Sequence, residues 1–429
     1  DQQRVKPLAL GNPGRIIAGR RPGDHQHDLA TLLVGIGLDR LETKRQSFAI
    51  VDEEAEPQLF SVSAPVWDFV LFCFAIYAAD VAVLRKGSAD GWTRQIELEV
   101  TLNNPAPWEK SRNIAENMLR VLTGDFWTLQ FRSGGPTPPN GQRRLCDRDC
   151  VALLSGGLDS LVGGIDATAQ GRRPIFVSQL AFEDSARQIA YANALGGGGW
   201  HQQWSHKVVF GGRKETSTRA RSMVFYGLAV LATSLLAVSR PEILVPENGF
   251  ISLNPPLLPG RMASLSTRTT HPLFMRLLQA LLDAVGIDAH LSMPYRFQTK
   301  GEMLQQCADQ VLLAKYGCDT TSCGRFRTYN RTHCGRCVPC MVRKAAVLHW
   351  GAADTTTYRF SSLSAAGKTS ADDPMAVACA VLAAEQRGVD SFLGATLSFA
   401  SDADRQHYRC VAERGLAELA VLLRRDGVL

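Results

Sequence analysis

The spacing of apolar positions along the chain changes near residue 150 and again near residue 350. Between these points, short continuous apolar runs alternate with helical patterns. The runs cover 151–154, 175–180, 207–210 and 243–245, and the helical patterns lie near 184–195 and 217–238. Because strands that are buried on both faces appear as continuous apolar runs, the runs predict a parallel sheet. Their alternation with helices predicts an α/β fold in which helices cover both faces of that sheet.

The residues before this region follow a mixed pattern, which predicts an N-terminal α+β domain. Helices are expected near 66–84 and 108–122, and strands at 95–102 and 126–131. The segment 95–102 alternates apolar and polar side chains, as a half-solvated antiparallel strand does. The segment 134–141 is rich in Pro and Gly and has no periodic apolar pattern, so it reads as a linker. We therefore place a domain boundary at residue 145.

The last part of the chain is rich in Ala and Leu, with helical patterns near 374–387 and 403–425. The sequence thus predicts three regions. These are an α+β domain over 1–145, an α/β domain over 146–350 and a C-terminal helical extension over 351–429.

Composition supports a folded protein with a substantial core. The chain has 429 residues, of which 45% are hydrophobic and 21% charged. These values exclude a disordered, collagen-like or coiled-coil protein and predict a chain of several domains. The net charge of +6 is too small to argue for nucleic acid by itself, so a nucleic-acid partner is not required. A mildly basic chain is compatible with anionic ligands such as nucleotides.

Cysteine usage and the absence of a membrane pattern predict a cytoplasmic protein. The chain has 11 cysteines, an odd number, and is too long to need disulfides for stability. We therefore expect metal ligands or core thiols in a reducing compartment. No secretory pattern is visible at the N-terminus. The most membrane-like stretch, 69–79, is shorter than the ~20 residues that span a bilayer, so a buried helix and no membrane contact are expected.

The clearest local signal is a glycine turn between a strand and a helix. Ser155, Gly156 and Gly157 follow the first apolar run, and a helix is expected to begin near Leu158. Glycines let the backbone turn sharply and approach a phosphate, and the new helix directs unpaired N–H groups at the anion. Ser155 and Ser160 add hydroxyl donors. The segment is neither a Walker loop nor GxGxxG, and a tight turn that uses Gly and Ser for geometry alone is the alternative.

A second signal is a cluster of four cysteines with the spacing C-x10-C-x2-C-x2-C. Its members are Cys323, Cys334, Cys337 and Cys340. Zn²⁺ takes four thiolates in a tetrahedral, closed site, so the cluster predicts structural zinc. A redox or iron–sulfur site is the alternative. His333 or Cys318 could replace one of the four ligands.

The cysteine cluster lies in a basic stretch without acidic residues. Its cations are Arg325, Arg327, Arg331, Arg336, Arg343 and Lys344. One interpretation is a surface that binds anions or RNA. The other is charge balance, since Zn²⁺ with four thiolates carries a formal charge of −2. The sequence leaves both open.

The glycine turn and the cysteine cluster together resemble one enzyme family. The segment 155–160 reads SGGxDS, which is similar to the signature of the PP-loop ATP pyrophosphatases. With the cysteine cluster it resembles the QueC-like enzymes, the 7-cyano-7-deazaguanine synthases, over about 150–350. The resemblance implies a PP-loop domain of the adenine nucleotide alpha hydrolase-like, Rossmann-type fold with a zinc lobe. It implies cofactors ATP, Mg²⁺ and Zn²⁺. It assigns ATP to Ser155, Gly156, Gly157, Leu158, Asp159 and Ser160, with Asp159 capping the helix or helping to hold Mg²⁺.

Three further segments match the family and imply roles for their residues. They are the arginine turn 218–222, the segment 246–250 in place of the acidic substrate loop, and the helix start 299–303. The implied catalytic residues are Asp159, Lys300, Arg219 and Arg221, and the implied substrate-binding residues are Asn248 and Glu302. The alternatives are solvated helix ends or surface pairs for the cations, a turn residue for Asn248 and a helix-terminus acid for Glu302.

The resemblance implies ATP-dependent, AMP-forming activation of a 7-deazaguanine-type carboxylate, followed by transfer to an amine to give an amide or nitrile. The protein's own work in such a reaction is positioning and charge stabilisation. The added flanking regions and the altered substrate loop resemble the QueC-like proteins of the Qat anti-phage defence system. This implies a protein partner in a defence complex, whose amine could accept the deazaguanine. Alternatives are a tRNA-thiolating PP-loop enzyme and a non-catalytic nucleotide-binding subunit.

Overall fold

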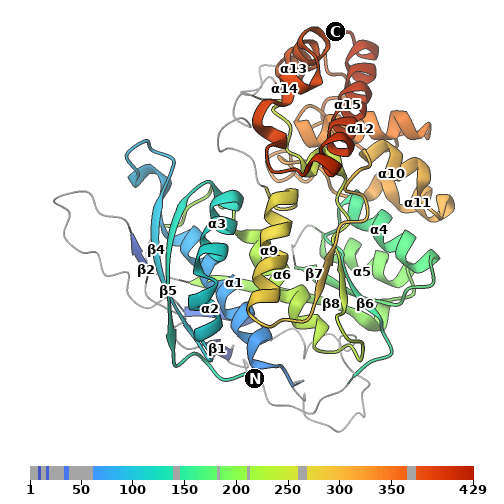
Figure 1. Cartoon of the computed structure of the whole chain (residues 1–429). Coiled ribbons are helices and arrows are strands. Elements are labelled where there is room, and N and C mark those ends of the chain that lie inside the picture. The colour runs from blue at the N-terminus through green and yellow to red at the C-terminus, as the bar shows by residue number, and fades with distance from the viewer. Residues whose placement is uncertain are drawn as a thin grey trace.

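The computed structural model describes residues 61–138, 145–180, 184–209, 213–258, 268–364 and 373–429, together with three short strands nearer the N-terminus. Within these residues the strands form two sheets (Figure 1). The larger has seven strands in the order β1-β3-β8-β7-β6-β9-β10, and the smaller has three in the order β2-β4-β5. The predicted α/β class is confirmed.

Parallel strands form the centre of the larger sheet. They are β6 (Cys150–Leu153), β7 (Pro174–Gln179), β8 (His201–Val209), β9 (Glu242–Leu244) and β10 (His290–Ser292). Every neighbouring pair in the series β8-β7-β6-β9-β10 is parallel. The four predicted strands therefore exist, although β8 starts at His201, well before the predicted 207–210 run. Strands β3 (Leu33–Gly37) and β1 (Leu8–Leu10) extend the sheet in antiparallel fashion beyond β8.

Helices cover both faces of the parallel strands, as predicted. Val151 and Leu153 of β6 point into one apolar cluster, and Cys150 and Ala152 point into another. The second cluster includes side chains of α4 (Leu158–Ala169) and α5 (Ser185–Ala194). Because successive side chains of a strand point to opposite faces, a strand between two helical layers is apolar at every position. This explains why the run was continuous.

The N-terminal region contributes a long helix and a three-stranded sheet. Its elements are α1 (Ala64–Ala82), β4 (Gln95–Leu102), α2 (Ala106–Lys110), α3 (Arg112–Thr123), β5 (Phe126–Ser133) and β2 (Ile16–Ala18). β4 has the alternating burial that its sequence predicted. The prediction of an antiparallel strand is correct only for its edge with β2, since β4 pairs with β5 in parallel. The helices between β4 and β5 return the chain to the same end of the sheet, which makes the pairing parallel.

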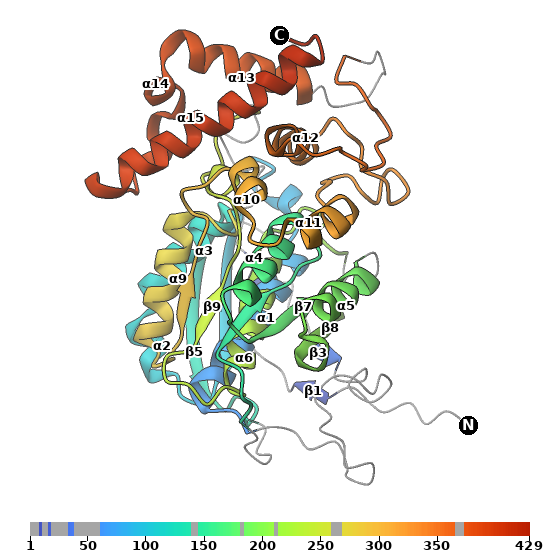
Figure 2. The same ribbon diagram turned by 90° about the vertical axis from the view of Figure 1, so that its right-hand side faces the viewer.

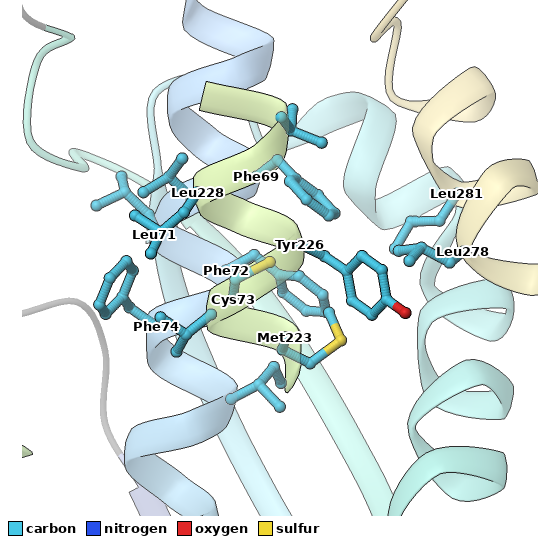
Figure 3. Close-up of a cluster of buried hydrophobic side chains, with 14 of the residues drawn as sticks. Phe69, Leu71, Phe72, Cys73, Phe74, Met223, Tyr226, Leu228, Leu278 and Leu281 are labelled. Carbon is cyan, nitrogen blue, oxygen red and sulfur yellow. The ribbon is translucent and has the colours of Figure 1, made fainter. Parts of the chain in front are cut away.

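Helix α1 packs against α6 (Arg221–Thr233) in the interior of the molecule. Figure 3 shows Phe69 and Phe72 of α1 beside Tyr226 of α6, with side chains of α9 (Pro272–Ala284) close by. The helices meet closely at Gly227, where an added Cβ would lie 3.0 Å from the Cys73 Cβ. One apolar cluster thus spans the predicted boundary at residue 145, and the N-terminal region shares its core with the central sheet.

Helix α1 is also the one helix, among the described residues, that is long and apolar enough to cross a membrane. Of its most apolar 18-residue window, 83% is buried inside the protein. The expected buried helix is therefore confirmed. Its all-round apolar character is explained by contacts with the smaller sheet on one side and α6 on the other.

The remaining helices form a layer at one end of the sheet (Figure 2). They are α7 (Gly249–Ser252), α10 (Lys300–Gln306), α11 (Gln310–Tyr316), α12 (Val338–Trp350), α13 (Asp373–Arg387), α14 (Val389–Leu393) and α15 (Asp402–Arg425). Short 3-10 turns lie at Arg85–Gly87, Gly198–Trp200, Gly317–Asp319 and Gly394–Leu397. The helices predicted near 374–387 and 403–425 are present. They pack with α7 and α12 around a shared apolar cluster, so the C-terminal extension covers the segment that follows β9.

Candidate functional site

The glycine turn joins β6 to α4 at the carboxyl end of the central strand. Gly156 has φ +90°, a left-handed conformation that favours glycine. A Cβ at this position would also lie 3.0 Å from the Cβ of Asp184. Gly157 is the N-cap residue of α4 and offers no side chain to its first N–H groups. The start of α4 therefore has amides available for an anion.

Hydrogen bonds hold this turn from two sides. The side-chain amide of Gln188 donates to the Ser155 carbonyl at 3.0 Å, and the Thr321 N–H donates to the Gly156 carbonyl at 3.1 Å. Within the turn, the Ser160 hydroxyl donates to the Gly157 carbonyl at 2.8 Å, and the Ser155 hydroxyl donates to Ser160 Oγ at 3.1 Å. The loop is thus preorganised before any ligand binds.

A cavity of about 800 Å³ opens at the carboxyl ends of the parallel strands. In open parallel sheets, ligands bind at this edge. The cavity is lined by the turn, by the residues after β7 and β9, by the segment before α6 and by the approach to the cysteine cluster. Nine predicted site residues line it: Ser155, Gly157, Leu158, Asp159, Ser160, Arg219, Arg221, Lys300 and the predicted metal ligand Cys323. Gly156, Asn248 and Glu302 are not among its lining residues.

Asp159 is the electrostatic centre of the cavity wall. Its carboxylate, only 6% exposed, forms an ion pair with the Lys300 ammonium and accepts hydrogen bonds from the Asn248 N–H and side-chain amide at 3.1 and 2.7 Å. Burial alone would raise the pKa of Asp159. The Lys300 charge and the hydrogen bonds from Glu247 and Asn248 outweigh burial and lower this pKa to about 2. Asp159 is therefore ionised at neutral pH.

Glu247 was not among the predicted site residues, yet it lines the cavity beside Asp159. Burial and the adjacent Asp159 carboxylate raise the pKa of Glu247 well above its usual value. Two neighbouring carboxyl groups that share one site do not both ionise easily. Glu247 therefore retains its proton and donates a hydrogen bond to the Asp159 carboxylate. The signal that could have identified it was its position just after β9, at the ligand-binding edge of the sheet.

Asn248 and Glu302, the two predicted substrate-binding residues, have structural contacts instead. Asn248 is fully buried, caps α7 by accepting the Ile251 N–H at 2.9 Å, and holds Asp159. Glu302 forms a capping box with Thr299 and an ion pair with Arg414 of α15. Asn248 thus has the contacts of a turn residue, and Glu302 those of an acid at a helix terminus, which were the alternatives to substrate binding.

Helix α15 holds the start of α10, from which Lys300 projects. The Thr299 hydroxyl donates to the Glu418 carboxylate. A Cβ at Gly301 would lie 2.6 Å from Glu418 Oε1 and 2.8 Å from the His349 Cβ, so a larger residue would displace these side chains. The C-terminal extension therefore positions a cation of the cavity.

Arg219 and Arg221 differ in environment. Arg219 is 6% exposed, and its guanidinium lies 4.9 Å from the centroid of the Trp92 ring. Burial and the nearby Arg85 guanidinium lower the pKa of Arg219 to about 10, so it stays charged at neutral pH. Arg221 is exposed and donates from Nε to the Gln179 side chain at 3.2 Å. Arg219 is the better-fixed cation of the two.

The four predicted cysteines come together in a buried cluster with their sulfurs within 4.8 Å of one another. The Sγ atoms of Cys323 and Cys337 lie 3.9 Å apart, as do those of Cys334 and Cys340. A tetrahedral zinc ion with Zn–S bonds of about 2.3 Å holds its sulfurs about 3.8 Å apart. None of the four cysteines forms a disulfide. The geometry thus fits a metal such as zinc.

Backbone N–H groups donate hydrogen bonds to these sulfurs, which stabilises the negative charge of thiolates. The N–H groups of Arg325 and Cys334 donate to Cys323 Sγ at 3.3 Å, and the Cys337 N–H donates to Cys334 Sγ at 3.2 Å. His333 and Cys318, which the sequence offered as replacement ligands, do not belong to the cluster. His333 Nε2 accepts the Ser322 N–H at 3.1 Å, and the Cys318 Sγ lies beside the Ala353 carbonyl.

The basic residues around the cluster divide into two groups. Arg343 is fully buried and donates to Gly317 and Thr320, which fixes the segment leading to Cys323. Lys344 likewise donates to backbone carbonyls. Arg325 and Arg327, by contrast, line the cavity. Structural and cavity-lining cations therefore coexist in this stretch, and Arg325 also forms an ion pair with Asp373 at 3.1 Å.

No protein-family model, no curated protein and no solved structure matches the chain. The geometry of the cavity and of the cysteine cluster therefore carries the functional argument.

Proposed function

We propose that the cavity binds ATP and that the chain is an AMP-forming enzyme that activates a 7-deazaguanine-type carboxylate and transfers it to an amine. One observation carries this proposal. The SGGxDS turn opens at the carboxyl end of the central parallel strand into the same cavity as Lys300, Arg219 and the Asp159 carboxylate. Amides and cations on one wall suit a polyphosphate, because both stabilise negative charge.

The proposed chemistry needs positioning more than acid–base catalysis. The substrate carboxylate attacks the α-phosphorus of ATP, the bond to the β-phosphate oxygen breaks, and pyrophosphate leaves with the electron pair. The amine then attacks the acyl adenylate, loses a proton and releases AMP. The amides of the turn and the Lys300 ammonium would stabilise the charge that develops on the phosphates. Mg²⁺, when bound, would neutralise phosphate charge, and Asp159 and Asp184 are carboxylates of the cavity wall that suit it.

The cavity volume and lining support a nucleotide together with a second, planar ligand. A volume of about 800 Å³ lies in the upper part of the range for small-molecule sites. Phe225, Tyr226 and Ile251 supply apolar lining away from the turn. The Glu247 carboxyl group also lines the cavity and offers an acceptor oxygen to a heterocycle. The deazaguanine assignment itself rests on the resemblance to QueC-like enzymes.

In this proposal the metal cluster is structural. Zn²⁺, when bound, would cross-link the segment 323–340. The residues just before it, Thr321 and Ser322, line the cavity, and Thr321 also binds the glycine turn. The cluster would therefore shape the cavity without touching the reacting atoms, as closed four-thiolate sites do.

A direct assay tests the proposal. The protein is incubated with ATP, Mg²⁺, 7-carboxy-7-deazaguanine and ammonia, and AMP and product masses are measured. We expect AMP to form only when the acid is present, and Asp159→Ala to abolish it. Asp166→Ala is the matched control, since Asp166 lies on the same helix but binds Tyr295 and Ala308 instead. No AMP above background in the wild-type protein would contradict the proposal.

The acceptor amine is tested separately. The resemblance to QueC-like proteins of a defence system suggests an amine on a protein partner in place of ammonia. Co-expression with proteins encoded beside it, followed by intact-mass measurement, should reveal a partner that gains the acyl group. An amide or nitrile formed with ammonia at full rate, and no modified partner, would assign the simpler reaction.

Thiol chemistry is less well supported. Burial raises the pKa of Cys150 and of Cys307 to about 12, which keeps both thiols protonated at neutral pH. Sulfur transfer requires a reactive thiolate, so these side chains are unsuited to it. A thiolated tRNA product would reverse this conclusion.

A further inference from the structure

The turn that carries Arg219 is held by the N-terminal region. The segment 215–220, which precedes α6, runs beside the end of α1. The Glu215 N–H donates to the Val81 carbonyl at 2.8 Å, and the Arg85 N–H donates to the Glu215 carboxylate at 2.9 Å. Arg85 Nε also donates to the Ser217 carbonyl at 3.2 Å. These bonds join segments that are far apart in the chain.

Asp80 makes the decisive contact. It lies on the last turns of α1 with a carboxylate that is 0% exposed. Its Oδ2 accepts the N–H groups of Arg219 and Ala220 at 2.6 and 2.7 Å. Ala220 is the N-cap of α6 and has no side-chain acceptor of its own. Asp80 therefore holds the two residues that lead into α6 from a different part of the chain, and fixes the backbone of Arg219 directly. Its negative charge also lies at the positive end of the helix dipole.

Asp80 belongs to a buried group of paired charges. Arg94 lies between Asp80 and Asp125, at 2.5 and 2.6 Å, and Arg85 binds Asp125 at 2.9 Å. Two carboxylates thus neutralise two guanidinium groups in the interior. Arg219 adds a third guanidinium, and among the described residues no carboxylate forms an ion pair with it. The partly buried Glu215 carboxylate also lies in this group, where it accepts the Arg85 N–H. The ring of Trp92 lies beside both Arg85 and Arg219, at 5.0 and 4.9 Å, and Arg219 lines the cavity.

We propose that Asp80 is a positioning residue of the ligand site. It holds the 215–220 turn so that Arg219, stacked on Trp92, presents its guanidinium to an anionic ligand of the cavity. The N-terminal region is then an integral part of this site. The inference rests on the proposed function to the extent that an anion binds in this cavity.

A conservative substitution separates positioning from stability. Asp80→Asn keeps the size of the side chain but removes the negative charge. Arg94, Arg85 and Arg219 then repel one another, and the Arg219 backbone loses a charge-assisted acceptor. Asp68→Asn is the matched control. Asp68 is buried on the same helix and accepts the N–H groups of Asn103 and Asn104 at 2.8 and 2.9 Å, outside the cavity lining.

The experiment measures ATP binding with Mg²⁺ by titration calorimetry on the full-length chain. Asp80→Asn and Asp68→Asn should both lower the melting temperature. Only Asp80→Asn should weaken ATP binding, by about ten- to a hundredfold, because a displaced cation loses its contact. In Arg219→Gln the added Asp80→Asn change should cost little further affinity, since both changes affect one contact. Equal affinity in the two aspartate variants would overturn the inference.

Two further measurements keep the outcome clear. If Asp80→Asn does not fold, Trp92→Leu replaces it, because Trp92 supports the Arg219 guanidinium and is only partly buried. We expect it to weaken binding several-fold, and unchanged affinity would count against the inference. Pyrophosphate and 7-carboxy-7-deazaguanine are titrated in parallel. If one of these anions binds but ATP does not, the proposed function is contradicted and the inference is tested with that anion; if none of the three binds, both are contradicted.

Discussion

Lys300 forms a buried ion pair with Asp159 across 141 positions of sequence. The pair joins the first turn of α10 to the first turn of α4. Lys300 follows a capping box that α15 supports, and Asp159 follows the glycine turn. A C-terminal helix thus contributes to the position of a cation beside the phosphate-binding turn.

Breaking this ion pair should lower the free energy of unfolding, and the loss should depend on whether one partner or both are replaced. Lys300→Met leaves the Asp159 carboxylate buried beside Glu247, and should reduce the free energy of unfolding by about 3 kcal/mol. The double variant Asp159→Asn with Lys300→Met should be more stable than Lys300→Met alone, because no charge is left unpaired. Urea unfolding measures both. The single variant Asp159→Asn completes the comparison. Additive losses in the double variant would show that the two side chains do not interact, and all three variants should lose AMP formation.

The glycine turn predicts a specific effect at Gly156. Gly156→Ala adds a Cβ at positive φ and against Asp184, so it should destabilise the chain and displace the turn. Gly171→Ala is the control, since Gly171 also has positive φ but has no atom near its missing Cβ. Each change should cost about 1 kcal/mol or more through backbone strain. Calorimetric ATP binding should be lost in Gly156→Ala and retained in Gly171→Ala; loss in both would point to a general folding effect.

The cysteine cluster predicts one metal ion per chain. Elemental analysis of the purified protein should find zinc at a ratio near one, and a strong chelator should lower the melting temperature. Cys337→Ser should remove the metal, because each thiolate occupies one corner of the tetrahedron. Cys318→Ser should leave the metal content unchanged, since its sulfur lies outside the cluster. Full metal content in Cys337→Ser would contradict this assignment.

Buried histidines predict acid sensitivity. Burial lowers the pKa of His201 from 6.5 to about 4, and its Nε2 lies 2.8 Å from the Ser178 hydroxyl. Below pH 6.5 the unfolded chain binds a proton that the folded chain rejects until about pH 4. Stability from this residue is therefore complete above pH 6.5 and is lost as the pH falls towards 4, by at most about 3 kcal/mol.

Comparison with His201→Gln isolates this contribution. The wild-type advantage in free energy of unfolding should shrink between pH 6.5 and 4.5 in urea titrations. Acid release of metal would affect both proteins alike and so would cancel in the difference. Parallel pH profiles for the two proteins would show that His201 does not titrate in this way.

Sequence patterns identified most elements and much of the cavity wall, for local reasons. The run at β6, the glycines and the start of α4 are neighbours in the chain, so their conformations follow from short-range preferences. The same holds for the cysteine cluster, whose tight spacing places the thiols together. The roles expected of Asn248 and Glu302 were not matched by their geometry, because a side chain beside a helix start can cap the helix as readily as it can face a ligand.

The sequence by itself thus determined the α/β class, the strand-to-helix turn at 155–160 and the four thiols, since each depends on residues that are close in the chain. Only the tertiary structure decided that β4 pairs in parallel with β5, that α1 shares a core with α6, and that Glu247 and Lys300 meet Asp159. It also decided that Asp80 holds Arg219. These contacts join distant segments, and they exist because packing brings particular faces together, which short-range preferences do not specify.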